Sequence, residues 1–210
     1  FSIQQVFAHQ TIHDLAQQLG IAEPSFGVPA TRTEPFSLIS EEDRLALPAE
    51  VEDAYPLTSL QAGMLYHMEL RPAGAPVYHN VNSFHVRAQL NVPVLRNAIQ
   101  RVVDRHAIMR TGFELTRYSQ PLQLVYRSSL IEVCEAEDVS LLAADEQQHV
   151  ISRFMKKEYE RAFDVAHPPL VRFNIHRRSA ETFQYTLTEC HAISDGWSTT
   201  SMFAEIFKYY

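Results

Sequence analysis

Residues 188–198 read Thr-Glu-Cys-His-Ala-Ile-Ser-Asp-Gly-Trp-Ser, and this stretch decides how the rest of the chain is interpreted. Apolar and polar residues alternate over 183–188, a period typical of a strand. Asp195-Gly196 is a turn signal, and a helix-like run follows over about 199–210. We therefore expect His191 where a strand passes into a loop, a position from which a side chain can face a cleft.

The composition is that of an ordinary globular protein, with 46% hydrophobic and 20% charged residues among 210. A net charge of -7 and the lack of a long basic run argue against a nucleic-acid partner. No apolar run approaches the roughly 20 residues of a membrane span, and the polar start does not resemble a signal peptide. Cys134 and Cys190 have no zinc-ligand spacing. We expect a cytoplasmic protein without a membrane partner.

Three segments are predicted. Residues 1–20 have the pattern of the end of a helical domain, with Thr11 and Asp14 spaced as a helix cap and Gly20 as a helix stop. Residues 21–50 are rich in proline and lack periodicity, as expected of a linker. Residues 51–210 form the main domain. Because the chain starts on Phe and ends in a helical run, we expect it to be part of a longer polypeptide.

The main domain is predicted to be an α/β (α+β layered) structure with a mixed sheet, because helical and strand periods are interleaved along it. Its helices are expected after two caps, Thr58 with Gln61 and Asn91, and over a long amphipathic run. Strand patterns lie between them, and the strands over 108–116 and 121–125 are predicted to form a hairpin. The expected helices are 59–68, 93–105, 143–161 and 199–210; the expected strands are 77–90, 108–116, 121–125, 130–135, 170–176 and 182–189.

His191 is the first candidate for chemistry, because a neutral imidazole can accept a proton near neutral pH. The alternative is a structural histidine with satisfied hydrogen bonds. Asp195, four residues later, has two readings: it orients the imidazole, or it shapes the loop as the partner of an arginine. We favour the second, with Arg110 as that partner, since a guanidinium in an apolar setting needs a carboxylate.

Other chemistries fit this stretch less well. Cys190 and His191 are adjacent on a strand and point to opposite faces, so they should not bind one metal ion or act as a nucleophile–base pair. Ser194 and Ser198 lack the strand-turn-helix context of a serine nucleophile. No metal site is predicted.

Three motifs together resemble the condensation domains of nonribosomal peptide synthetases. Residues 57–65, Leu-Thr-Ser-Leu-Gln-Ala-Gly-Met-Leu, resemble the first family motif. Residues 105–113, Arg-His-Ala-Ile-Met-Arg-Thr-Gly-Phe, are similar to the second. Residues 190–196, Cys-His-Ala-Ile-Ser-Asp-Gly, are similar to the third, in which the family has His-His at the first two positions. Cys190 replaces the first of these histidines, and His191 keeps the second, the functional one in the family.

Residues 1–19 resemble the last helices of a peptidyl carrier domain, whose phosphopantetheine-bearing serine lies upstream in the family and is not in this chain. No cofactor is therefore expected on the domain formed by residues 51–210. The first motif looks most like domains that take a D-configured donor. Trp197-Ser198 fits condensation better than epimerisation.

The resemblance implies the N-terminal lobe of a chloramphenicol-acetyltransferase-like fold, incomplete without a C-terminal lobe and inactive alone. It implies peptide-bond formation between aminoacyl groups held as thioesters on 4′-phosphopantetheine, with His191 as the working residue. Gly196 is a candidate oxyanion donor, and Asp195, Arg110, Cys190 and Trp197 are expected to be structural. Expected partners are donor and acceptor carrier domains and an adenylation domain. The alternatives are epimerisation, another acyl transfer on this fold, or a degenerate domain that only recruits carriers.

Overall fold

The computed structural model describes residues 3–19, 33–70 and 77–210. The chain divides into two compact units, residues 1–34 and 35–210. The first unit contains two short helices, in which Thr11 Oγ1 accepts from the Asp14 N–H at 3.1 Å, as the predicted cap requires. Gly20 and residues 21–32 of the predicted linker lie outside the described residues. The helices are α1 (Ile3–Ala8) and α2 (Ile12–Leu19).

The second half of the predicted linker is a folded part of the second unit. It contains the short helix α3 (Glu41–Leu45), which Ser40 caps. The Asp43 carboxylate accepts from the Ser119 N–H at 2.9 Å. This stretch has no sustained apolar period, so the sequence pattern could not distinguish this anchored segment from a free linker.

The second unit contains a three-stranded antiparallel sheet with the order β1-β4-β3. The pairing of β3 with β4 confirms the predicted hairpin. A short 3-10 helix, η1 (Ala107–Arg110), leads into β3. The strands are β1 (Val51–Pro56), β3 (Thr111–Glu114) and β4 (Leu122–Tyr126).

A second, four-stranded sheet has the order β2-β7-β6-β5. β5 runs parallel to β6 and the other pairs are antiparallel, so the sheet is mixed, as predicted. β2 pairs with β7 over nine residues without a bulge, from His79 opposite Cys190 to Arg87 opposite Thr182. The strands are β2 (His79–Arg87), β5 (Val133–Glu135), β6 (Val171–Arg177) and β7 (Thr182–Cys190).

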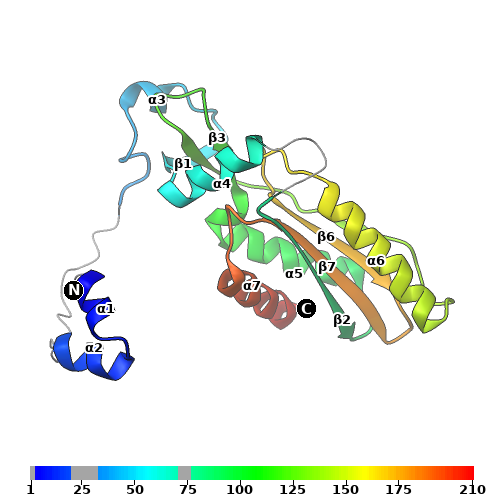
Figure 1. Ribbon diagram of the computed structural model, residues 1–210. Coiled ribbons are helices and arrows are strands. Elements are labelled where there is room, and N and C mark those ends of the chain that lie inside the picture. The colour runs from blue at the N-terminus through cyan, green and yellow to red at the C-terminus, as the bar shows by residue number, and fades with distance from the viewer. Residues whose placement is uncertain (1–2, 20–32, 71–76) are drawn as a thin grey trace. The chain divides into compact units, whose positions relative to one another are not determined.

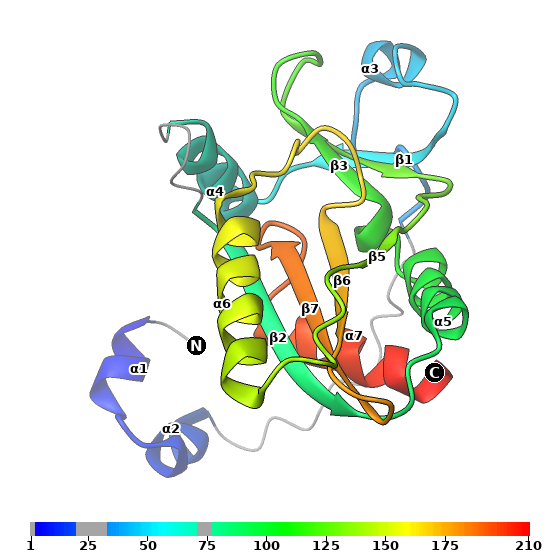
Figure 2. The ribbon, with the colours of Figure 1, turned by 90° about the vertical axis from the view of Figure 1, so that its right-hand side faces the viewer.

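Helices cover both faces of this sheet, with α6 on one side and α5 and α7 on the other (Figures 1 and 2). The predicted capping box is present in α4: Thr58 and Gln61 bond each other's main chain. α7 starts three residues earlier than predicted, because Asp195 caps it. No helix in the described part of the chain is long and apolar enough to cross a membrane. The helices are α4 (Ser59–Glu69), α5 (Val92–Arg105), α6 (Ala144–Glu160) and α7 (Gly196–Tyr209).

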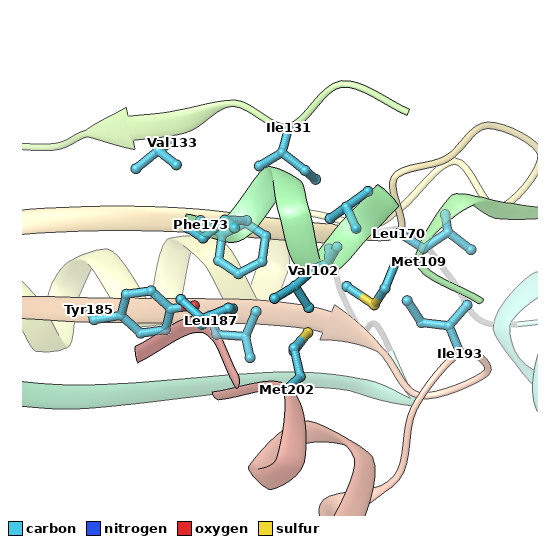
Figure 3. Packing of buried hydrophobic residues seen from close by; sticks show 14 of the residues in the cluster. Val102, Met109, Ile131, Val133, Leu170, Phe173, Tyr185, Leu187, Ile193 and Met202 are labelled. Carbon is cyan, nitrogen blue, oxygen red and sulfur yellow. The ribbon is translucent and has the colours of Figure 1, made fainter. Parts of the chain in front are cut away.

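The main core lies between the sheet and helices α5 and α7, and β7 contributes one side of it (Figure 3). Tyr185 and Leu187 of β7 are fully buried there, in one cluster with the buried Val102 of α5 and Met202 of α7. An aliphatic side chain such as Leu187 contributes about 1.5–3 kcal/mol by leaving water. This packing fixes β7, and His191 follows its last residue directly.

Candidate active site

His191 is half-buried at the start of the loop between β7 and α7. Its N–H donates to the Tyr78 carbonyl at 2.7 Å, which extends the β2–β7 pairing by one more contact. Its ring nitrogen Nδ1 lies 3.3 Å from the Asn80 amide nitrogen. The main chain is thus held by the residue before β2 and one edge of the ring by β2 itself, and the predicted strand-to-loop position of His191 is confirmed.

The His191 side chain lines a pocket of about 430 Å³ between β2 and the first turns of α7. Three alternate residues of β2 form one wall, because successive side chains on a strand point to opposite faces. Gly196, at the start of α7, lies on the opposite wall. The lining residues are Asn80, Asn82, Phe84, Glu189, His191, Gly196, Thr199, Thr200 and Phe203.

Glu189 connects the strand, the loop and the helix around this pocket. The residue is only 2% exposed. Its carboxylate accepts from the Ser194 hydroxyl at 2.6 Å and from the Thr199 hydroxyl at 2.7 and 2.8 Å. Ser194 belongs to the loop and Thr199 to α7, so one buried side chain of β7 ties both to the sheet.

Two further contacts hold the loop on its other side. Gln61, the residue that completes the α4 capping box, donates its side-chain amide to the Ala192 carbonyl at 3.2 Å. Ile193 is buried and points into the core near Met109 (Figure 3). Three elements therefore hold the loop that carries His191: β2 through Asn80, β7 through Glu189 and α4 through Gln61.

The predicted ion pair between Asp195 and Arg110 is wrong. Arg110 donates instead to the Glu52 carboxylate at 2.7 Å and to the Tyr126 carbonyl, both in the three-stranded sheet. Asp195 is exposed and accepts from the Ser198 N–H at 2.8 Å as the N-cap of α7. This bond lowers the pKa of Asp195, with a smaller contribution from the nearby His191. A carboxylate satisfied by the helix start has no need of a distant guanidinium.

Cys190 is fully buried in the main core, directly across from His79 on β2. Burial raises the pKa of its thiol to about 11. The thiol is therefore protonated at neutral pH and is not a nucleophile. At such a fully buried position, cysteine serves as a small apolar side chain.

Trp197 lies in the first turn of α7 and is 83% exposed. It lines a second pocket of about 300 Å³ on the other side of α7, together with His106, Met109 and Glu205. His191 does not line this pocket. Trp197 therefore does not share the His191 pocket.

Sequence reasoning missed Asn80 and Glu189. Their common signal is the strand period: Asn80 and Glu189 are opposite each other in the β2–β7 register and on the same face. That register becomes visible only once the two strands are paired. Within the described residues, no group of three or more His, Cys, Asp or Glu side chains has the geometry of a metal site.

A family model described as a condensation domain matches residues 51–210. The AMB antimetabolite synthetase AmbE of Pseudomonas aeruginosa is 35% identical over 216 residues, which cover 100% of this chain and 10% of the relative. A linear gramicidin synthase of Brevibacillus parabrevis is 34% identical over 160 residues, 76% of this chain and 3% of the relative. The chain thus spans a small fraction of the length of the curated relatives it matches.

Solved structures show the same fold. The starter condensation domain of rhizomide synthetase RzmA superposes with a TM-score of 0.67 at 15% identity, over 76% of this chain and 39% of that one. The four-domain nonribosomal peptide synthetase AB3403, bound to AMP and glycine, gives 0.64 at 19% identity, over 78% and 12%. The predicted layered, chloramphenicol-acetyltransferase-like fold class is thereby confirmed. On the match over residues 51–210, the chain belongs to the condensation domain family.

Proposed function

We propose that residues 51–210 form the histidine-bearing, N-terminal lobe of a condensation domain that joins two carrier-bound aminoacyl groups. The observation that carries the proposal is the position of His191, which lines an open pocket on a loop held from three elements. Its Nε2 takes no hydrogen bond from any described residue, so that nitrogen is free to meet a substrate. Family membership supports the reaction class.

The proposed reaction is the aminolysis of a thioester. The acceptor amine attacks the donor carbonyl carbon, the C–N bond forms, and the C–S bond breaks with its electron pair going to sulfur. The proton that nitrogen loses ends on the departing thiolate. Holding amine and thioester together supplies much of the rate, because proximity converts a bimolecular step into an intramolecular one.

His191 has three candidate roles in this step: positioning the amine, accepting its proton, or stabilising the charge that develops. The Gly196 N–H is a second candidate donor to the oxyanion. It lies in the first turn of α7, where backbone N–H groups have no intrahelical acceptor and the helix dipole favours negative charge.

The proposed partners are a donor and an acceptor carrier domain, each presenting its substrate on 4′-phosphopantetheine, with an adenylation domain and a C-terminal lobe nearby. Residues 1–20 are proposed to be the end of such a carrier domain. Two similarities support these partners: AmbE is similar along the whole chain, and AB3403 is a four-domain synthetase. We propose that no cofactor binds the lobe itself.

The test is dipeptide formation by a module that carries this chain, measured in a single turnover with loaded donor and acceptor carriers. His191→Ala should lower the rate by about 100-fold or more. His85→Ala is the matched control, because His85 is an exposed histidine of β2 outside the pocket, and its rate should match the native protein.

An unchanged rate for His191→Ala would show that the catalytic reading is wrong. If the native module binds both carriers but makes no dipeptide, the domain recruits carriers rather than joining their substrates. Cys190→His then shows whether the departure from the family motif is responsible, since restoring the histidine should restore the rate.

A further inference from the structure

Among the residues that the structure describes, Asn80 is the one whose side chain hydrogen-bonds to the His191 ring. The β2–β7 register puts Asn80 opposite Glu189, and both side chains line the His191 pocket. From there the Asn80 amide nitrogen reaches His191 Nδ1 at 3.3 Å. The hydrogen bond from the His191 backbone N–H to the Tyr78 carbonyl anchors the main chain beside the ring. The ring therefore meets β2 at Nδ1 rather than at Nε2.

The Asn80 amide nitrogen, not the amide oxygen, faces His191 Nδ1, and this orientation sets the direction of the bond. An amide NH₂ group has donors and no acceptor, so Nδ1 must be the acceptor. A neutral imidazole carries one proton, and a ring that accepts at Nδ1 carries it at Nε2. In the described part of the chain nothing hydrogen-bonds to Nε2, so no contact there favours the other tautomer.

We propose that Asn80 is a positioning residue that holds neutral His191 as the Nε2–H tautomer, so that the ring meets its substrate as a hydrogen-bond donor. The catalytic meaning rests on the proposed function. In that reaction, Nε2–H donates to the thioester carbonyl oxygen as it gains negative charge, and the ring keeps its proton. The amine proton leaves nitrogen through water and ends on the departing thiolate sulfur. Of the three candidate roles of His191, this one is charge stabilisation.

The tautomer is measurable on this chain without any activity. Long-range ¹H–¹⁵N correlation spectra distinguish the protonated ring nitrogen of a neutral histidine from the bare one. At about pH 8.5, above the range in which imidazoles ordinarily titrate, His191 should show a protonated Nε2 and a bare Nδ1. Its signals are identified among those of the ten histidines by their loss in His191→Gln.

Asn80→Asp should reverse the pattern, because a carboxylate is an acceptor and draws the proton to Nδ1. Asn82→Asp is the matched control: Asn82 is on the same strand, face and pocket wall, but it makes no hydrogen bond to His191. It should leave the tautomer unchanged. A protonated Nδ1 in the native chain overturns the proposal, as does an Nε2–H tautomer that persists in a folded Asn80→Asp chain.

The rate of dipeptide formation then tests whether the Nε2–H tautomer is used in catalysis. If Nε2–H is the working group, Asn80→Asp should slow the single-turnover rate by about 100-fold, the effect of losing one preorganised donor. A faster rate in Asn80→Asp would overturn the donor role, because a bare Nε2 is the form that accepts a proton. If the spectra agree but His191→Ala is fully active, the tautomer stands and the proposed function fails.

Discussion

Glu158 and Glu189 are two buried glutamates on opposite sides of β7, and they are stabilised in different ways. Glu158, on α6, is 5% exposed and pairs with Arg172 at 2.8 Å. It also accepts from Thr188 of β7 at 3.2 Å. Glu189 is 2% exposed and has two hydroxyl partners but no cation among the described residues. Glu158, which a cation balances, belongs to the scaffold. Glu189, which has no cation partner in the described part of the chain, lies beside the His191 pocket.

The pKa of Glu158 reflects this balance. Burial alone raises it, but the hydrogen bond and the charge of Arg172 outweigh burial and lower it. Burial also lowers the pKa of the Arg172 guanidinium, which lies over the Phe163 ring at 4.1 Å. Each ion thus stabilises the other inside the protein.

The largest loss of stability should come from Glu158→Gln, and it should exceed the loss from the same change at Glu189. Glu158→Gln leaves the half-buried Arg172 without its counter-charge, which should cost up to about 3–5 kcal/mol of unfolding free energy. Glu189→Gln keeps an acceptor oxygen for Thr199 and removes no ion pair, so it should cost below about 1.5 kcal/mol. Urea unfolding of the two variants measures the difference.

The double variant Glu158→Leu with Arg172→Met is the control for that experiment. It removes both charges, so it should regain much of the stability that Glu158→Gln loses. Equal losses of unfolding free energy for the two Glu→Gln changes would mean that pairing with Arg172 does not set Glu158 apart from Glu189.

The pH dependence of stability tests the Glu158 side of β7. His79 is buried next to this pair, and burial, aided by Arg172, lowers its pKa from 6.5 to about 4. Between these values the unfolded chain binds the proton and the folded chain does not. Stability should therefore fall as pH drops from about 6.5 to about 4.

His79→Phe keeps a ring at this position and removes the titration. Urea unfolding at several pH values should show a flatter profile for this variant than for the native chain over that window. Parallel profiles would show that His79 does not contribute the pH dependence.

The smallest effect is expected at the cap of α7, on the Glu189 side. Asp195→Ala removes the acceptor for the Ser198 N–H and should lower the melting temperature slightly. Asp195→Asn should keep most of the stability, because its side-chain oxygen can cap the helix as well. If Asp195→Ala destabilised the chain as much as Glu158→Gln, Asp195 would have a partner beyond the helix start.

Much of the framework around the site followed from local patterns. The alternation over 183–188 predicts a strand over 182–189, which the structure extends to Cys190 as β7. The spacing of Thr58 and Gln61 predicted the start of α4, because a capping box involves only neighbours in sequence. Such features depend on residues a few positions apart, and a single sequence contains them in full.

The partners of buried charges could not be predicted in this way. The sequence predicts Asp195 as the partner of Arg110, but Arg110 pairs with Glu52, a residue of β1 that reaches it only through the order of the three-stranded sheet. Glu189 was not singled out, because its hydroxyl partners become adjacent only when the loop folds back. Which carboxylate meets which donor depends on tertiary packing, which the local patterns do not contain.

The nine-residue register of β2 and β7 brings Asn80 and His191 together, although 111 positions separate them. A one-residue insertion in β2 would turn Asn80 to the other face of the sheet. Point substitutions along the strand carry no such penalty. When such domains are recombined, a junction between residues 80 and 191 joins a strand from one parent to a histidine from another. Only parents with equal strand lengths will keep the imidazole aligned.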